Sequence, residues 1–371
     1  MKSFIPYSLI AAALACGFAS AQTPTTAYTT PVGYTSVTID KNADTRVGLP
    51  FRQPTVAAAA LTETPTANVL TVAGAAFGTY GGTHYVKFTS GLSNGKIYAI
   101  TTNDATTITI DLNGDTLAAV STDTFSVSKF WTLKELFDPA LSTSDPLTTG
   151  NAIVASTGTT VPARRTTLMT PQNGGVGSNL VSQWTYYIAP IAPTLPVPGP
   201  LAPHWVRTTS NSTNYDDQQL WPDLSFIIRH PASVTSSTVY VNTGEVDMGT
   251  SIITLETKVG ATSDNAVALT RPVDVTLSQL NLGGTSAFVS SAGTTVPVRR
   301  DLLMVYFGGT PSQNKVSTAT YYYDGNASMW RKTTSSTYNA NSDVIPAGVG
   351  FMIRKYAGTG ATSFWTNTPS Y

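Results

Sequence analysis

The sequence predicts an all-β protein made of two duplicated antiparallel β-sandwich-like modules, with a small β-barrel or sandwich domain inserted in the first. Three observations lead to this prediction. The chain is rich in threonine, serine, glycine, tyrosine and valine, and β-branched and aromatic side chains suit a pleated, half-buried surface. Short segments of alternating polar and apolar residues are separated by turn dipeptides such as Asn94-Gly95. One long motif occurs twice, which indicates an internal repeat.

Residues 1–21 predict a secretory signal peptide. A lysine at position 2 supplies positive charge, an apolar stretch runs to Ala15, and residues 19–21 (Ala-Ser-Ala) form a small-x-small cleavage pattern. The apolar stretch is shorter than the roughly 20 residues that a membrane span needs. We therefore expect an exported mature chain beginning at Gln22, in the periplasm, on the outer surface or outside the cell, with no membrane span.

The only cysteine, Cys16, lies inside this segment, so the mature chain is expected to contain no disulfide. Residues 13–17 also resemble a lipoprotein processing site, in which Cys16 is lipidated and kept as the new N-terminus. An alanine stands where that pattern usually has leucine, so lipidation is the less favoured alternative.

The charge balance argues against nucleic acid as a partner. The chain has 21 basic and 21 acidic residues, and charged residues make up 11% of it. An average soluble domain has about 25%. Binding to nucleic acid depends on a concentrated basic surface, and no segment here provides one.

The repeat is clearest at residues 158–165 (GTTVPARR) and 293–300 (GTTVPVRR). At the same spacing, residues 185–187 (TYY) align with residues 320–322 (TYY), and further on Trp205 aligns with Trp330. These matches predict a first copy at residues 22–62 and 131–245 and a second copy at residues 246–371. We expect the two copies to pack together as a pseudo-twofold pair, because one alone would have a modest core.

Two segments of the first copy have no counterpart in the second. Residues 63–130 have no counterpart in the second copy, and their alternating segments predict the inserted small β-domain. A proline-rich stretch at residues 191–200 is also confined to the first copy, which places it in a surface loop.

Residues 131–136 (WTLKEL) resemble residues 275–280 (VTLSQL), and each predicts one helical turn with threonine near its N-cap.

The chain resembles an uncharacterised family of exported β-rich proteins typical of verrucomicrobial bacteria. The resemblance rests on residues 30–34 (TPVGY), residues 47–50 (VGLP), residues 131–137 (WTLKELF) and the duplicated C-terminal pattern of Trp followed by Phe-x-Ile-Arg. It covers nearly all of the mature chain, although each motif alone is loose. Since that family has no known activity, the resemblance implies export and architecture and no functional residues.

Few residues suggest catalysis, and we expect no metal, cofactor or catalytic residue. The three histidines, His84, His204 and His230, are far apart in the sequence and are interpreted as ordinary surface or strand residues. Residues 111–115 (DLNGD) faintly resemble a calcium loop, but the glycine is misplaced and a type I′ turn explains them better. A glycosidase-like pair of carboxylates remains open, because such pairing is spatial.

Two groups of side chains are candidates for ligand binding. The duplicated arginine pairs, Arg164-Arg165 and Arg299-Arg300, suit anionic groups on a glycan, but their presence in both copies favours a structural role. Aromatic side chains either stack on sugar rings or fill a β-sandwich core, and the second reading is favoured. The possible glycan-binding residues are Trp184, Tyr186, Trp205, Tyr321, Tyr323 and Trp330.

The first functional hypothesis is an exported, non-enzymatic surface or envelope protein with a structural or adhesive role. The alternatives are a carbohydrate-binding module protein and a secreted hydrolase acting on glycans. Glycans or other surface proteins are the expected partners, and the sequence does not predict the oligomeric state.

Overall fold

The computed structural model describes residues 30–137, 152–171, 183–188, 203–210, 212–358 and 360–369. The chain divides into two compact units, residues 1–30 and residues 31–371, and the description below concerns the second. Strands make up 42% of the structure and helices 5%, which confirms an all-β, antiparallel, sandwich-like fold. The expected signal peptide, Cys16 and the proline-rich stretch at 191–200 lie outside the described residues.

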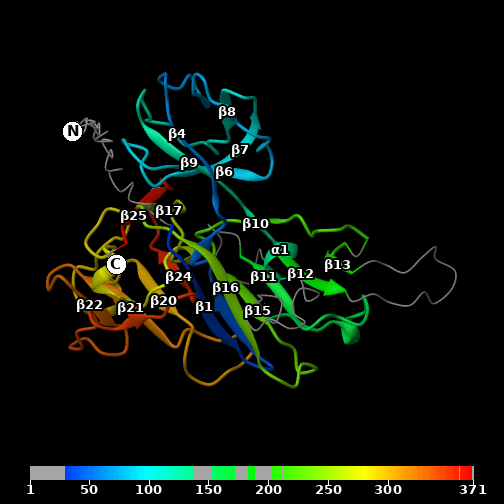
Figure 1. Cartoon of the computed structure of the whole chain (residues 1–371). Coiled ribbons are helices and arrows are strands. Elements are labelled where there is room, and N and C mark those ends of the chain that lie inside the picture. The colour runs from blue at the N-terminus through cyan, green and yellow to red at the C-terminus, as the bar shows by residue number, and fades with distance from the viewer. Residues whose placement is uncertain are drawn as a thin grey trace, which may run out of the picture. The chain divides into compact units, whose positions relative to one another are not determined.

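A five-stranded antiparallel sheet is the centre of the first module, which we define as residues 31–54 and 131–245 (Figure 1). Its inner side chains, among them Leu168, Trp205 and Phe226, are fully buried and form a core of their own. The strands lie in the order β13-β12-β11-β15-β2. Their bounds are β2 (Asp44–Val47), β11 (Thr167–Thr170), β12 (Gln183–Ile188), β13 (His204–Arg207) and β15 (Phe226–Arg229).

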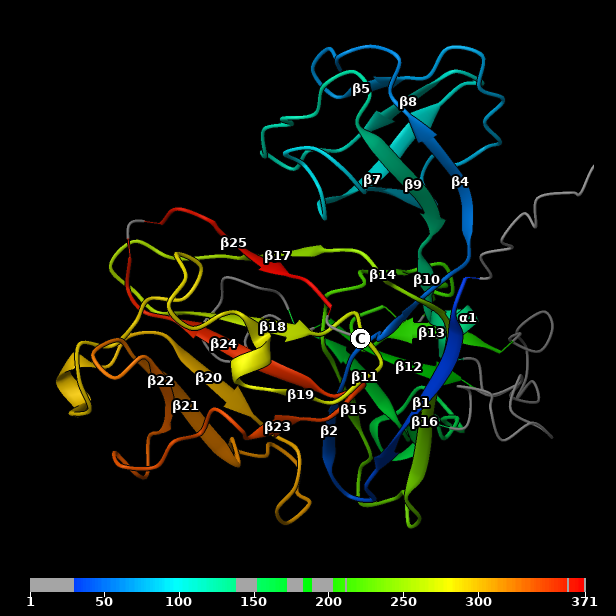
Figure 2. The same ribbon diagram turned by 60° about the vertical axis from the view of Figure 1, so that its left-hand side comes forward.

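The second module, residues 246–369, contains a five-stranded sheet with the corresponding order, β22-β21-β20-β24-β18 (Figure 2). Its registers match as well, because Val47 lies opposite Phe226 in the first sheet and Val267 opposite Phe351 in the second. Its core is separate and includes Trp330. The bounds are β18 (Ser263–Ala268), β20 (Leu302–Val305), β21 (Ala319–Asp324), β22 (Met329–Lys332) and β24 (Gly350–Lys355).

At corresponding positions, each five-stranded sheet has a bidentate ion pair between its edge strand and the neighbouring strand. Arg229 donates from Nε and Nη2 to the carboxylate of Asp44, at 2.6 Å for each bond. Arg354 donates in the same way to Asp264, at 2.7 and 2.9 Å. The planar guanidinium fits both carboxylate oxygens at once, so each pair helps to fix the register of its two strands.

Smaller antiparallel sheets flank both five-stranded sheets in matching positions. Val37 lies opposite Tyr240 in the first module, and Ile253 lies opposite Trp365 in the second. In the first module they are β1 (Val32–Ile39), β16 (Thr238–Val246) and β3 (Phe51–Arg52), and β10 (Trp131–Thr132) with β14 (Gln219–Leu220). In the second they are β17 (Ser251–Leu255) with β25 (Ser363–Asn367), and β19 (Val275–Thr276) with β23 (Val344–Ile345).

The expected helical turns are present. They are α1 (Leu133–Phe137) and a 3₁₀ turn at Ser278–Leu280. The Glu135 N–H donates to Thr132 Oγ1 at 3.3 Å, and the Gln279 N–H donates to Thr276 Oγ1 at 3.3 Å. Each threonine thus satisfies a backbone donor at the start of its turn, where no earlier carbonyl is available. The duplicated GTTVP motifs form two more 3₁₀ turns, Val161–Ala163 and Val296–Val298.

The inserted domain is one six-stranded sheet in the order β4-β9-β6-β7-β8-β5. In the described residues its two edge strands do not pair with each other, so the sheet is open and not a closed barrel. Strand β4 lies ahead of the expected boundary at residue 63, because it pairs with β9 and therefore belongs to this sheet. The bounds are β4 (Thr55–Ala60), β5 (Val69–Thr71), β6 (His84–Phe88), β7 (Ile97–Asn103), β8 (Thr107–Ile110) and β9 (Thr124–Lys129).

The two modules meet through reciprocal backbone contacts. Val47 forms a bridge with Val349, and the residues at the matching positions, Val267 and Leu224, form the second bridge. Matching residues also face each other directly. A Cβ on Gly48 would lie 2.2 Å from the Cβ of Ala268, and a Cβ on Gly350 would lie 2.4 Å from that of Ser225. This is the pattern that a pseudo-twofold axis between the modules produces, and glycine is needed on one side of each contact.

The inserted domain is bonded to the second module at two places. Lys87 of β6 forms an ion pair with Asp247, which lies between β16 and β17. The Ile252 N–H of β17 donates to the carbonyl of Gly95 at 2.9 Å. The inserted domain therefore contributes to holding these segments in place.

Candidate functional site

The aromatic residues expected as a possible glycan platform lie in the protein interior. Tyr186 and Trp205 are 0% exposed, Trp330 is 2% exposed and Tyr321 is 6% exposed. Tyr323 is partly buried against the core of the second module, and the side chain of Trp184 lies outside the described residues. A sugar ring can stack only on an exposed aromatic face, so the buried residues do not form the expected platform. Trp205, Tyr321 and Trp330 lie in the two sheet cores, and Tyr186 lies in a small separate cluster with Ile188 and Val206.

The alignment of the tyrosine-rich strands is wrong by one residue. Leu168 pairs with Thr185, whereas Leu303, at the matching position, pairs with Tyr321. Thr185 therefore corresponds to Tyr321 and not to residue 320. A shift of one residue exchanges the two faces of a strand, and the correct register gives Tyr186 and Tyr322 the same environment.

In each module an arginine side chain stacks on the ring of this tyrosine. The guanidinium carbon of Arg164 lies 4.8 Å from the ring centre of Tyr186, and that of Arg299 lies 4.8 Å from the ring centre of Tyr322. Arg164 also donates to the carbonyl of Thr159 at 3.3 Å. Two of the four duplicated arginines are thus held by stacking in the fold, which agrees with the favoured structural interpretation.

The other two arginines bond the loop that precedes them. Arg165 Nη1 donates to the carbonyl of Pro162 at 2.9 Å, and Arg300 Nη1 donates to that of Pro297 at 3.4 Å. In each module the arginine side chain thus bonds to a carbonyl of the 3₁₀ turn that precedes it. The geometry therefore gives both pairs a structural role.

His230 differs from the expected surface residue. It is 0% exposed, its Nδ1 lies 3.0 Å from Thr166 Oγ1, and its Nε2 lies 2.8 Å from Thr238 Oγ1. Burial lowers the pKa of His230 to about 4. His204 begins strand β13 and does not lie in a loop, and His84 begins β6. His84 Nδ1 lies 2.7 Å from the hydroxyl of Thr83.

The second module has a charged pair where the first has His230 and Thr166. Lys355, at the position of His230, forms an ion pair with Asp301, at the position of Thr166, and the two side chains are 2% and 0% exposed. Asp301 also accepts the Tyr356 N–H at 2.7 Å and the Val289 N–H at 2.8 Å. In the first module Thr166 Oγ1 accepts the matching Val154 N–H, at 2.9 Å, and the residue after His230 is a proline, which has no N–H to donate.

The expectation that the sequence contains no Gly-x-Ser-x-Gly pattern of serine hydrolases is wrong, because residues 91–95 (GLSNG) match it. The structure does not support a nucleophile there. That pattern requires a turn from a strand into a helix, whereas these residues connect strand β6 to strand β7. Ser93 is also 0% exposed, so its hydroxyl cannot reach a substrate from solvent.

Three of the acidic residues that a glycosidase-like pair could use are engaged in ion pairs or accept backbone N–H groups. Glu245 lies 3.4 Å from Arg52, and Glu135 pairs with Lys129. Asp216 is buried and accepts the Trp205 N–H at 2.9 Å. Among the described residues, no group of three histidine, cysteine or acidic side chains could hold a metal ion. Asn113 and Gly114 have φ angles of 45° and 81°, as the expected type I′ turn requires.

Two more ionisable groups have pKa values shifted by burial. Burial lowers the pKa of Lys87, although Asp247 opposes this effect, and burial raises the pKa of Asp223 to about 6. Shifted values gather at functional sites but also in structural ion pairs. Lys87 lies in such a pair, and Asp223 lies beside the contact between the modules, where its carbonyl accepts the Ala268 N–H at 2.9 Å.

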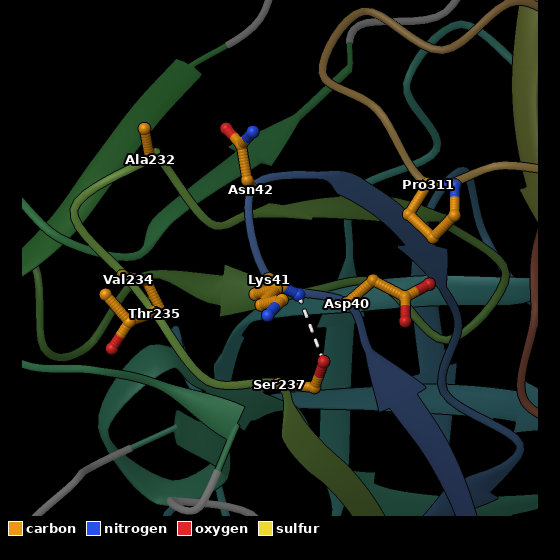
Figure 3. A pocket seen from close by; sticks show the side chains of 8 residues that line it. All are labelled: Asp40, Lys41, Asn42, Ala232, Val234, Thr235, Ser237 and Pro311. Atoms are coloured by element: carbon orange, nitrogen blue, oxygen red, sulfur yellow. Dashed lines mark hydrogen bonds between the residues drawn. The ribbon is translucent and has the colours of Figure 1, made fainter.

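A pocket of about 530 Å³ lies beside the turn between β1 and β2 (Figure 3). It offers the polar side chains of residues 40–42, with Thr235 and Ser237 across from them. The Lys41 N–H donates to Ser237 Oγ at 3.2 Å and joins the two sides. No aromatic ring lines it, and Asp40 is its one carboxylate. Its hydrogen-bonding groups lie beside the apolar side chains of Ala232, Val234 and Pro311. Its lining residues are Asp40, Lys41, Asn42, Ala232, Val234, Thr235, Ser237 and Pro311.

Comparison of the chain with known protein families, with curated proteins and with solved structures finds no match. No helix in the described part of the chain is long and apolar enough to span a membrane.

Proposed function

We propose that this protein is an exported, non-enzymatic surface or envelope protein with a structural or adhesive role. The observation that supports it best is its set of buried and partly buried ion pairs, which link segments far apart in the sequence. Lys87 pairs with Asp247, Arg229 with Asp44, and Lys355 with Asp301. Because breaking a buried pair leaves an uncompensated charge, these pairs strongly favour one arrangement of the chain.

We also propose that the two modules arose by duplication and that the chain belongs to the exported verrucomicrobial family that it resembles. The equal strand orders and the equal registers of the two five-stranded sheets support the duplication. A repeated module that packs against its copy enlarges the buried core without a disulfide, which suits a protein working outside the cell.

Cell fractionation tests the location and the role. The native chain and a variant lacking residues 2–21 are expressed in the source bacterium, and both are followed through cytosol, periplasm, envelope and medium. We expect the native chain in the envelope or medium and accessible to protease added to intact cells, with the variant retained in the cytosol. A native chain found in the cytosol would contradict export. Hydrolysis of a polysaccharide panel by the purified chain would contradict a non-enzymatic role.

Carbohydrate binding is the second candidate, and it rests on the pocket beside Lys41, whose lining includes both polar and apolar side chains. Neighbouring hydroxyl, amide and carboxylate groups can bond sugar hydroxyls without an aromatic platform. A glycan array with the native chain and with Asn42→Ala/Ser237→Ala tests this candidate. Binding that the double variant abolishes would support it, and an empty array would count against it.

A further inference from the structure

Strand β1 is the edge strand of the sheet β1-β16-β3 (Figure 1). It is eight residues long and pairs with β16 over its whole length, from Val32 opposite Glu245 to Ile39 opposite Thr238. An edge strand presents a row of backbone N–H and C=O groups to which another strand can bond.

The register shows which groups of β1 face outward. The Val246 N–H donates to the carbonyl of Pro31 at 2.8 Å, so residue 31 exchanges bonds with β16. In an antiparallel pair these bonds alternate along the strand, so residues 33, 35, 37 and 39 also bond to β16. The backbone groups of Val32, Tyr34, Ser36 and Thr38 therefore point away from it. Within the described part of the chain, no backbone group outside the sheet bonds to them.

The matching strand of the second module is treated differently. Ile252 of β17 corresponds to Ser36, and its outward N–H donates to the carbonyl of Gly95 in the inserted domain at 2.9 Å. Strand β1 lacks such a cover and also lacks the usual protection by charge, since residues 30–39 contain no charged side chain. Its exposed face includes Val32, which is 75% exposed, and Tyr34, which is 63% exposed.

We propose that β1 pairs antiparallel with β1 of a second copy of this chain about a twofold axis. The result is one continuous sheet of six strands, in the order β3-β16-β1-β1-β16-β3. With Tyr34 of each copy opposite Ser36 of the other, all four outward residues of each strand meet outward residues, which gives about eight new backbone hydrogen bonds. Val32 of each copy then lies opposite Thr38 of the other.

A second copy fits this edge for two reasons. The strand is uncharged, so self-pairing brings no like charges together, and Asp40 of one copy lies opposite Thr30 of the other. The matching strand β17 is already bonded by Gly95 on this side, and because the contact uses β1 of both copies about a twofold axis, it closes at two copies.

Sedimentation-velocity ultracentrifugation of the mature chain from 0.5 to about 50 µM tests the proposal, because it covers the range of ordinary homodimers. Ser36→Pro removes one outward N–H and leaves the bonds to β16 intact, and Ser36→Lys places a charge at the twofold contact. The matched control is Val259→Lys, at a valine that is 77% exposed in the second module.

We expect the native chain and Val259→Lys to sediment as dimers, and both Ser36 variants to raise the dimer Kd at least tenfold with an unchanged circular dichroism spectrum. Ser36→Lys alone decides the matter if Ser36→Pro does not fold. A native chain that stays monomeric throughout, or one that captures a strand of another protein in place of its own copy, overturns the proposal. Dimers that persist in the folded Ser36 variants overturn it as well.

Discussion

Removal of Asp301 is the most informative test of how the second module is held together. The Asp301→Ala variant leaves the ammonium of Lys355, which is 2% exposed, without its carboxylate. It also leaves the N–H groups of Val289 and Tyr356 without the acceptor that now lies 2.8 and 2.7 Å away. Lys355 keeps only its bond to the carbonyl of Ala287, at 2.5 Å. Breaking a buried ion pair in this way costs about 3–5 kcal/mol.

The first module supplies the matched rescue. Its pair of Thr166 and His230 occupies the same place without charge, so Asp301→Thr/Lys355→His transplants a combination that the fold already accepts. We expect this double variant to recover part of the loss. A deficit of about 1–3 kcal/mol should remain, because the Tyr356 N–H still lacks an acceptor. Adding Tyr356→Pro removes that N–H, as the proline after His230 does in the first module, and should reduce the deficit.

Urea unfolding followed by tryptophan fluorescence measures these differences, because Trp330 and Trp365 lie in the core of the second module. The control is Lys134→Ala, which removes an ion pair 3.6 Å long whose lysine side chain is 57% exposed, and it should cost less than about 1 kcal/mol. A loss below about 1 kcal/mol for Asp301→Ala, or a double variant no more stable than the single one, would refute the reasoning.

Three further predictions concern other parts of the fold. Burial lowers the pKa of His230 to about 4, below the roughly 6.5 of an unfolded histidine, so its neutral ring contributes stability that is complete above pH 6.5 and is lost as the pH falls towards 4. His230→Gln should flatten this part of the pH profile of thermal unfolding, and an unchanged profile would count against it. Lys87→Ala removes the ion-pair partner of Asp247 and should speed limited proteolysis around the inserted domain. Lys87→Met/Asp247→Leu removes both charges and should slow the proteolysis again. Equal cleavage rates in the native chain and both variants would show that the pair is dispensable. Trp205→Ala and Trp330→Ala should each lower stability by about 3–5 kcal/mol, and a folded variant of native stability that had merely lost glycan binding would contradict the assignment of these rings to the core.

The sequence predicts the fold class well because its strongest signals are local and periodic. Alternating segments, turn dipeptides and the threonine before each helical turn depend on neighbouring residues, and the structure has the expected elements at these places. The GTTVP repeats likewise form the same 3₁₀ turn twice. Burial of the aromatic residues follows from the same alternation, once the strands are in register.

Features set by distant contacts are harder to predict. In the first module Leu168 of β11 pairs with Thr185 of β12, 17 residues further along the sequence. In the second module Leu303 of β20 pairs with Tyr321 of β21, 18 residues further along, and nothing in the letters TYY reveals this extra residue. Strand β4 contains a run of alanines with low β propensity, so only its pairing with β9 identifies it. The hydrogen-bond partners of the buried His230 are Thr166 and Thr238, which lie 64 and 8 residues away in the sequence. The residues next to His230 therefore do not predict its burial.

A double-mutant cycle on Gly350 and Ser225 tests the central claim, that the two modules meet about a pseudo-twofold axis where matching residues face each other. A Cβ on Gly350 would lie 2.4 Å from Ser225 Cβ and 3.1 Å from the carbonyl oxygen of Val47. Gly350→Ala should therefore cost about 1–3 kcal/mol of the free energy of unfolding in the native background. In the Ser225→Gly background most of that cost should disappear, because the glycine has merely changed sides. An equal cost in both backgrounds would contradict the claim.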